Sequence, residues 1–290
     1  MIARAIRHVD AFTAVPLEGN PAAVVDGDGL STETMQRIAL NQHLSETVFL
    51  FPPKDGANHA QLRIFTPGSE LPFAGHPTLA AAHVLVSESR VQLAEGEELR
   101  LETGAGVIPL TVTPGAQPMY TMTQARPQFR EAEESRAEVA SWLGLDVADI
   151  ADLERVSTGL WWLVARISSL DAMMRVQPDF TRLEGKEISV FCIGAQSSDA
   201  DVHVRTFAPG AGITEDPVTG SSNGCIAALI ARDGLLRERK GAISYVAEQG
   251  LEMGQPGRVY VRVTGIPDHL SVQVGGNAVT VLRGELLLPD

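Results

Sequence analysis

The stretch VFLFPPKDGANHAQLRIFTPG, residues 48–68, decides the fold because the chain repeats it. At an offset of 142 residues the sequence is VFCIGAQSSDADVHVRTFAPG, residues 190–210, and no gap is needed. The identical pairs are Val48–Val190, Phe49–Phe191, Arg63–Arg205, Phe65–Phe207, Pro67–Pro209 and Gly68–Gly210. Both copies have the pattern of a strand, a turn and a second strand, followed by R-x-F-x-P-G. Internal duplication explains this shared order better than chance does.

The repeat continues beyond a short insertion. ELPFAG, residues 70–75, lies over EDPVTG, residues 215–220, and each copy then enters an apolar, alanine-rich helix. Because the offset is close to half of the 290 residues, we expect two similar domains related by a pseudo-two-fold axis. We place them at residues 1–125 and 126–290, and the last strand could cross back to the first domain. A shared site would lie where equivalent elements of the two domains face one another.

Strands outnumber helices in the pattern of apolar residues. Alternation and short apolar runs predict strands at 4–12, 20–27, 47–51, 60–65, 98–103, 107–113, 160–167, 188–193 and 201–208, with four more toward the C-terminus. Helical spacing predicts helices at 31–44, 75–89, 130–144 and 221–233. Few strands have a crossover helix between them, so we expect an α+β fold and not a doubly wound sheet.

Composition argues against several classes of function. The formal net charge of −13 disfavours a nucleic-acid or anionic-membrane partner, and no apolar run reaches the ~20 residues that span a bilayer. The N-terminal sequence MIARAIRHVDAF has the pattern of a strand and not of a signal peptide, so a soluble cytoplasmic protein is expected. Neither an HExxH nor a GxxxxGK[ST] motif occurs, and Cys192 and Cys225 form no disulfide framework. We therefore expect neither a metal nor a cofactor.

Each copy carries a Pro-x-x-Gly turn at the start of its helix. The first amides of a helix lack intrahelical partners, and the helix dipole adds partial positive charge there. A glycine, at Gly75 and at Gly220, lets a ligand approach the backbone closely. Two such helix starts could bind a carboxylate and stabilise its enolate-like form. The alternative is that both are ordinary capped helices that pack through small residues.

Glu46 is an acid that only the first copy carries. It lies over Ile188 and directly precedes an apolar strand. Burial there would raise its pKa and suit it to proton transfer near neutral pH. A rim position or a strand-end cap is the alternative.

Two further polar residues distinguish the copies. His76 occupies the position that Ser221 has in the second copy, and the helix dipole disfavours a cationic form of this histidine. It could bind a ligand as a neutral donor or acceptor, or simply cap or pack the helix. Asp216 lies over Leu71, and it could be a ligand-binding acid or only an N-terminal charge or cap.

A serine or cysteine nucleophile is weakly supported. TGSSN, residues 219–223, does not place Ser221 at the centre of G-x-S-x-G, because Asn223 stands where glycine would be needed. Cys225 falls one turn into the helix and is expected to be a small packing residue. A two-thiol acid/base pair would need a cysteine at each helix start, and these positions hold His76 and Ser221.

Five segments together resemble the phenazine-biosynthesis PhzF-like family: VDAFTAVPLEGNPAAVV, LSETVFLF, RIFTPGSELPFAGHPTLAAA, RTFAPGAGITEDPVTGSSNGCIAAL and EQGLEMGQPGRVYV. The resemblance runs from about residue 8 to residue 289. It implies a fold related to diaminopimelate epimerase, in which each half is a strongly curved sheet or barrel around a central helix. It also implies a homodimer and a cofactor-independent isomerase that moves a proton, as when a dihydro-hydroxyanthranilate ring becomes a ketone for phenazine assembly.

The resemblance also implies roles for the residues of its motifs. Glu46 of SETVF would be the general acid/base. His76 of AGHPT and Asp216 of EDPVTG would orient the amino and hydroxyl groups of the substrate and tune Glu46. The substrate carboxylate would be bound by backbone N–H groups around Gly75, Gly220 and Ser221.

One departure from the family pattern concerns the substrate. Ser222-Asn223 stands where members often have alanine after the serine, which could alter the pocket near the carboxylate. The expected function is therefore an isomerase acting on a small carboxylated metabolite of open identity. The alternative is a non-catalytic protein that binds small carboxylates on the same scaffold.

Overall fold

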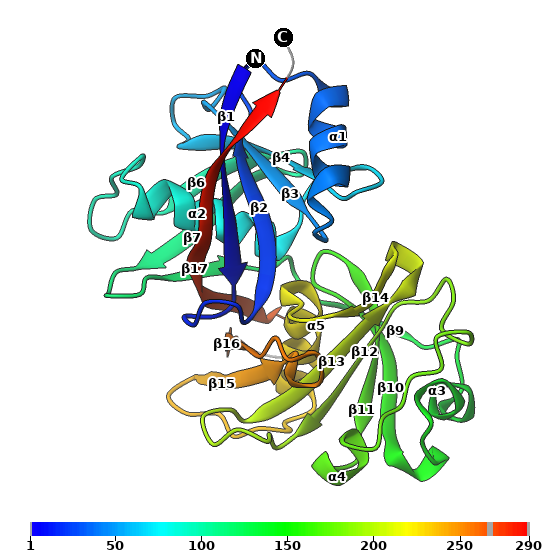
Figure 1. The fold of residues 1–290 in the computed structure, drawn as a ribbon. Coiled ribbons are helices and arrows are strands. Elements are labelled where there is room, and N and C mark those ends of the chain that lie inside the picture. Colours follow the sequence, from blue (N-terminus) through cyan, green and yellow to red (C-terminus); the bar gives the residue numbers. More distant parts are fainter. Residues whose placement is uncertain (1, 266–268, 289–290) are drawn as a thin grey trace. The chain divides into compact units, whose positions relative to one another are not determined.

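The computed structural model describes residues 2–265 and 269–288, which divide into two compact units (Figure 1). The first unit contains the chain up to Met122 and again from Gly275 onward, and the second contains Thr123–Val274. β17 (Ser271–Leu288) belongs mostly to the first unit, where it pairs antiparallel along the whole of β1 (Ile2–Ala11). The chain therefore leaves the first unit once and returns to it for its last strand.

The strands of the first unit follow one another in a regular series of pairings. After β1 they are β2 (Asn20–Asp26), β3 (Thr47–Phe51), β4 (Ala60–Phe65), β5 (Glu70–Leu71), β6 (Leu99–Thr103), β7 (Gly106–Thr113) and β8 (Met119–Thr123). β1 pairs antiparallel with β2, β2 parallel with β3, and β3 antiparallel with β4. β4 then pairs antiparallel with β5 and parallel with β6, and β6 pairs antiparallel with β7.

The second unit repeats this series strand by strand. Its strands are β9 (Gln128–Glu131), β10 (Ile150–Ser157), β11 (Trp161–Ile167), β12 (Ile188–Ile193), β13 (Val202–Ala208), β14 (Ile213–Asp216), β15 (Ala242–Gln249) and β16 (Gly257–Thr264). β10 to β16 pair in the same order and with the same directions as β1 to β7. The edge of β10 pairs with β9, whereas the edge of β1 pairs with β17. The duplication seen in the sequence is thus a duplication of topology.

One long helix is buried inside each unit. α2 (Gly75–Ser87) packs against β1, β2, β3 and β4, and α5 (Gly220–Arg232) packs against β10, β11 and β16. Both helices are apolar on nearly all sides, as expected for a helix surrounded by strands. Their alanines, at 80–82 and 227–228, are fully buried. The central helix predicted for each half is present.

The remaining helices are peripheral and begin at serine caps. They are α1 (Thr32–Gln42), α3 (Arg136–Leu143) and α4 (Leu170–Met173), with short 3-10 turns at Val147–Asp149, Pro209–Ala211 and Leu251–Met253. The hydroxyls of Ser31, Ser135 and Ser169 each accept a hydrogen bond from a first-turn amide. No helix within the described ranges is long and apolar enough to cross a membrane.

The structure corrects two of the predicted elements. The helix predicted at 130–144 is split into β9 and α3, because Ser135 and Glu138 form a capping box that starts the helix there. The residues before it pair instead with β10, a strand that was not predicted because charged residues interrupt its apolar pattern. Toward the C-terminus the described residues form three strands and not four, since β17 is 18 residues long.

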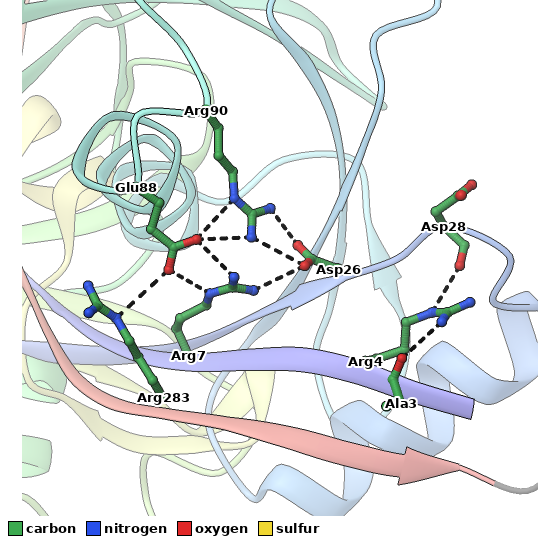
Figure 2. Close-up of polar contacts among 8 residues, drawn as sticks. All are labelled: Ala3, Arg4, Arg7, Asp26, Asp28, Glu88, Arg90 and Arg283. Carbon is green, nitrogen blue, oxygen red and sulfur yellow. Dashed lines mark hydrogen bonds and ion pairs between the residues drawn. The ribbon is translucent and has the colours of Figure 1, made fainter. Parts of the chain in front are cut away.

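Charged side chains fasten the C-terminal end of α2 to the surrounding strands (Figure 2). Arg7 on β1 donates to both carboxylate oxygens of Glu88, at 2.9 and 2.8 Å. Arg90 joins Glu88 to Asp26 on β2, with 2.6 Å between Arg90 Nη1 and Asp26 Oδ1. Arg283 on β17 lies 3.8 Å from Glu88. This network fixes one end of the helix whose other end carries the FAGHPT turn.

Candidate active site

Glu46 is buried at the junction of α1 and β3. Its side chain is about one-tenth exposed, and Oε2 lies 3.3 Å from Nε2 of His76 without the geometry of a hydrogen bond. Burial raises the pKa of the Glu46 carboxyl, and a hydrogen bond from Ser45 opposes the rise. A raised pKa makes this carboxyl a stronger base, which suits it to taking up and returning a proton.

His76 is the second residue of α2 and is also buried. Besides its approach to Glu46, its Nε2 lies 3.5 Å from the Ser45 hydroxyl. The first unit therefore brings together two of the predicted site residues, Glu46 and His76, beside Gly75 at the helix start. Ser45, the residue before Glu46 in SETVF, contacts both of them and was not singled out from the sequence.

Both central helices begin without the serine cap of the peripheral ones. The N-cap residues are Ala74 for α2 and Thr219 for α5, and neither makes a side-chain cap hydrogen bond to its helix. Pro77, in the first turn of α2, has no N–H to offer. The N–H groups that precede Pro77 in that turn are those of Gly75 and His76. Helix starts of this kind suit an anionic ligand.

Gly75 is not required by packing within its own unit. A Cβ added to it would meet only the terminal methyl of Met122, at an ordinary 3.8 Å. Gly224, one turn into α5, differs, since a Cβ there would lie 2.8 Å from the Thr158 hydroxyl. Packing explains Gly224, whereas Gly75 leaves room beside the helix start for something other than the protein.

In the second unit, Asp216 ends β14 and lies before the turn into α5. Its Oδ2 accepts a hydrogen bond of 2.5 Å from the Thr219 hydroxyl, and its carbonyl accepts one of 2.9 Å from Gln249. Gln249 also contacts the side chain of Asn223, at 2.9 Å. All four residues are buried. Asn223, one of the two residues that depart from the family pattern, is thus hydrogen-bonded within its own unit.

The hydroxyl groups of the two serines at the start of α5 have different partners. Ser221 Oγ accepts a hydrogen bond of 3.1 Å from the indole N–H of Trp162 on β11. Ser222 Oγ is fully buried and is shared between Thr206 Oγ1, at 3.1 Å, and the Thr219 carbonyl, at 3.3 Å. Ser221 keeps some exposure, so only this serine can meet a ligand.

Neither cysteine has the surroundings of a nucleophile. Cys225 is fully buried between the Thr158 hydroxyl and the Val156 carbonyl, and burial raises the pKa of its thiol to about 11. Burial likewise raises the pKa of the Cys192 thiol to about 12. A thiol in such surroundings stays protonated near neutral pH, and the expected packing role of Cys225 is confirmed. Across residues 2–265 and 269–288, no group of three or more His, Cys, Asp or Glu side chains is arranged to hold a metal ion.

The predicted site residues fall into two groups, one in each unit. Glu46, Gly75 and His76 belong to the first unit, and Asp216, Gly220 and Ser221 belong to the second. Sequence reasoning missed Thr219, Gln249 and Trp162, which hold the second group in place. Gln249 lies in the EQG motif near the C-terminus, which was a usable signal. No local pattern in LWWLVARI indicated that Trp162 would reach Ser221.

Comparison with known proteins shows the family. Residues 9–284 match the family model described as phenazine biosynthesis-like protein. The chain is 34% identical over 285 residues to the trans-2,3-dihydro-3-hydroxyanthranilate isomerase of Pseudomonas fluorescens, covering 97% of this chain and 98% of that protein. The predicted resemblance is therefore confirmed.

Solved structures agree with this assignment. A phenazine biosynthesis protein of the PhzF family from Bacillus anthracis is 31% identical, with a TM-score of 0.89 over 99% of this chain and 100% of that one. A hydroxyproline epimerase from Agrobacterium vitis, 14% identical, has the same fold with a TM-score of 0.64 over 99% of this chain and 93% of that one. The predicted epimerase-like fold class is confirmed. The chain belongs to the phenazine biosynthesis-like family of isomerases.

Proposed function

We propose that this protein isomerises a small carboxylated metabolite by moving a proton between two of its carbons, with Glu46 as the general acid/base. The observation that carries the proposal is the buried Glu46 carboxylate, 3.3 Å from His76 and next to a helix start that no serine caps. A base of raised pKa beside a place for an anion is the minimum that such chemistry needs.

The name of the relative indicates which carbon acids suit this site. In trans-2,3-dihydro-3-hydroxyanthranilate the carbon bearing the hydroxyl group adjoins one end of a conjugated pair of ring double bonds, and the carbon bearing the carboxylate is the other end of that pair. Removing the proton from the first carbon gives a delocalised anion whose charge reaches the carboxylate. Returning it to the second carbon shifts the double bonds and leaves an enol, which becomes a ketone. One proton moves and no electrons are gained or lost.

Each remaining site residue has a role in that reaction. We assign the substrate carboxylate to the amides around Gly75, Gly220 and Ser221, because developing negative charge there is stabilised by the helix dipole. His76 and Asp216 would hold the hydroxyl and amino groups of the substrate. His76 would also tune Glu46, which it contacts directly.

Solvent exchange tests the role of Glu46. Turnover of trans-2,3-dihydro-3-hydroxyanthranilate in D₂O is expected to place deuterium on the carbon bearing the carboxylate, detected by NMR. Glu46→Gln should lower both turnover and exchange by about 10³-fold while leaving binding nearly intact. Glu187→Gln is the matched control, because burial also raises the pKa of that carboxyl and it precedes β12 as Glu46 precedes β3. Unchanged exchange in Glu46→Gln overturns the proposal.

The same experiment separates catalysis from simple binding. A small-carboxylate-binding protein would be stabilised against heat by its ligand and would show no deuterium exchange with any ligand that it binds tightly.

We further propose, from the family resemblance, that the enzyme is a cytoplasmic homodimer. Sedimentation equilibrium would give a mass near twice 31.0 kDa in that case.

A further inference from the structure

Four buried side chains of the second unit form one hydrogen-bonded chain that ends on Asp216. Asn223 Nδ2 lies 2.9 Å from Gln249 Oε1, Gln249 Nε2 lies 3.1 Å from Thr219 Oγ1, and Thr219 Oγ1 lies 2.5 Å from Asp216 Oδ2. The Thr219 amide also donates to Gln249 Oε1, at 3.1 Å. Asn223 and Gln249 are 0% exposed, and Asp216 and Thr219 are each 8% exposed.

The chain has one direction of donation. Gln249 Nε2 must donate, because its other contact is the Asp216 carbonyl, at 2.9 Å. Thr219 Oγ1 accepts from Gln249, so its own hydrogen is available for the carboxylate of Asp216. The Gln249 amide uses both of its donors and both of its acceptor positions, which fixes its orientation. In the three side-chain bonds of the series, donation therefore runs from Asn223 through Gln249 and Thr219 to Asp216.

The first unit shows that the fold forms without this series of hydrogen bonds. The parallel pairing of β4 with β6 corresponds to that of β13 with β15, and it places Thr103 where the second unit has Gln249. At the other three positions, Leu71 replaces Asp216, Ala74 replaces Thr219 and Thr78 replaces Asn223. Thr103 uses its hydroxyl on the Gly106 carbonyl of its own hairpin. The same turn and helix thus form without the series.

A separate bond of Asn223, outside the series, has a counterpart in the first unit and marks what the fold itself uses. Thr78 Oγ1 donates to the Ala74 carbonyl at 2.7 Å, as Asn223 Nδ2 donates to the Thr219 carbonyl at 3.0 Å. Both bonds tie the first turn of a central helix to its N-cap. What the second unit adds is the extension through Gln249 and Thr219 to the acid.

We propose that Thr219 and Gln249 are positioning residues, which hold the Asp216 carboxylate in one orientation for a cationic or hydrogen-donating group of the substrate. The inference rests on the proposed function of Asp216 as a substrate-binding acid. A substrate amino group is the chemistry that such a preorganised carboxylate recognises best.

Two variants of Thr219 separate the hydroxyl from the shape of the side chain. Thr219→Val keeps the branched shape and removes the donor, whereas Thr219→Ser keeps the donor. With trans-2,3-dihydro-3-hydroxyanthranilate as the probe, Thr219→Val is expected to lower kcat/KM by about 10- to 100-fold, the worth of one hydrogen bond to a charged group. Thr219→Ser should stay within about threefold of the wild type. In an Asp216→Asn background, Thr219→Val should have little further effect.

Two results would contradict the proposed role of the series, which we also call the relay to Asp216. One is an equal loss in Thr219→Ser and Thr219→Val, and the other is an undiminished loss in the Asp216→Asn background. Either would mean that Thr219 acts through the fold and not through the acid.

A readout without substrate separates this inference from the proposed function. If the wild type leaves the probe unchanged, the proposed substrate class is wrong, and the ¹³C signal of the Asp216 carboxyl at pH 7 still decides the relay. That signal should move in Thr219→Val and stay in place in Thr219→Ser. An unmoved signal in both variants contradicts the inference.

Discussion

The two units of this protein share a topology and the contacts that hold it together, and they differ in the polar residues near the start of the central helix. In each, an arginine of the R-x-F motif pairs with the glutamate of the next strand: Arg63 with Glu70 at 2.7 Å, and Arg205 with Glu215 at 2.8 Å. Each guanidinium also stacks on the phenylalanine two residues later. These contacts explain why the motif recurs in the sequence. The shared residues build the scaffold, so the unshared ones are where function should be sought.

In both units a glutamate accepts hydrogen bonds from two successive loop amides, and this glutamate is buried more deeply in the second unit. Glu102 accepts from the amides of Lys54 and Asp55, and in the second unit Glu248 accepts from those of Gln196 and Ser197. Glu248 is fully buried and also bonds His203, at 2.7 Å. His203 in turn contacts Glu252, at 3.0 Å. We call these two residues, Glu102 and Glu248, the clamp glutamates. The clamp glutamate of the second unit is part of the buried core.

At the C-terminal ends of the central helices the charges are exchanged. The first unit sets Arg7 of β1 against Glu88 beyond α2, whereas the second sets Glu154 of β10 against Arg232 of α5, at 2.7 and 2.6 Å (Figure 2 shows the first). Either polarity joins a helix end to the same strand. Both units have an ion pair at this place, and its charges are reversed between them.

The largest expected effect comes from the acid that only the first unit carries. Glu46→Gln should lower turnover by about 10³-fold, the usual contribution of a general acid/base. It should also stabilise the fold, because a raised carboxyl pKa means that ionising Glu46 opposes folding. This gain should be absent at low pH and should grow as pH rises through the ordinary glutamate value of 4.5 to the raised one. Urea unfolding from pH 4 to 8 measures it, and a gain that shrinks with pH contradicts the assignment.

The clamp glutamates should rank next, and unequally. Glu248→Ala leaves His203 and two amides without their buried acceptor and is expected to cost about 3 kcal/mol of unfolding free energy. Glu102→Ala removes the same kind of bonds where water can replace them, so its loss should be clearly smaller. Urea unfolding of both variants at pH 7 gives the comparison. Equal losses would mean that burial of the second clamp adds nothing.

Much of the frame could be predicted from the sequence. The repeat predicted the two central helices and the hairpins before them, because apolar alternation and the turn motifs are local signals. The strand β10 was missed, since its charged residues, such as Glu154, form ion pairs that depend on distant partners. The extent of α3 was overestimated, because a helical charge pattern does not show where a competing strand pairing begins.

The candidate site was predicted only in part. Glu46, His76 and Asp216 stood out because one copy has a polar residue where the other has an apolar or different one. Gln249 lies 30 residues from Thr219, and Trp162 lies 59 from Ser221, so their contacts depend on the folded arrangement of strands. The alternative that both central helices are ordinary capped helices lost support only when the structure showed that the side chains of Ala74 and Thr219 make no cap hydrogen bond.

The charge network of the first unit should give a medium effect that depends on pH. Burial alone would raise the pKa of the Glu88 carboxyl, but the hydrogen bonds and charges of Arg7 and Arg90 outweigh it and lower that pKa. A lowered carboxyl pKa stabilises the fold above the ordinary value of 4.5, and the contribution is lost as pH falls below it. Arg7→Ala should therefore cost about 2 kcal/mol at pH 7 and less at pH 3. Arg232→Ala, at the more exposed joint, is the control and should cost less. A larger loss at pH 3 than at pH 7 would contradict the network.

Substitutions of the two glycines should have contrasting effects, one on stability and the other on ligand binding. Gly224→Ala should destabilise the fold by about 2 kcal/mol, because its Cβ meets the Thr158 hydroxyl at 2.8 Å. Gly75→Ala should leave the stability within about 1 kcal/mol of the wild type and should weaken binding of 3-hydroxyanthranilate, an aromatic carboxylate probe. Thermal unfolding and calorimetric titration give the two quantities. Normal binding by Gly75→Ala would show that no ligand approaches this helix start.

The smallest expected effect tests the hydroxyl of Ser221. The indole N–H can only donate, so Ser221 Oγ accepts from Trp162 and its own hydrogen is directed elsewhere. Trp162→Phe keeps the ring and removes the donor, which frees the hydroxyl to rotate. We expect KM for trans-2,3-dihydro-3-hydroxyanthranilate to rise about fivefold with kcat unchanged, the worth of one neutral hydrogen bond. Trp161→Phe is the control, because that indole lies 3.9 Å from the guanidinium of Arg130 and makes no such bond. Two results would contradict this role: an unchanged KM in Ser221→Ala, or a rise in KM from Trp162→Phe that is undiminished in a Ser221→Ala background. Either would mean that the hydroxyl does not contact the substrate and that the helix start binds through its amides alone.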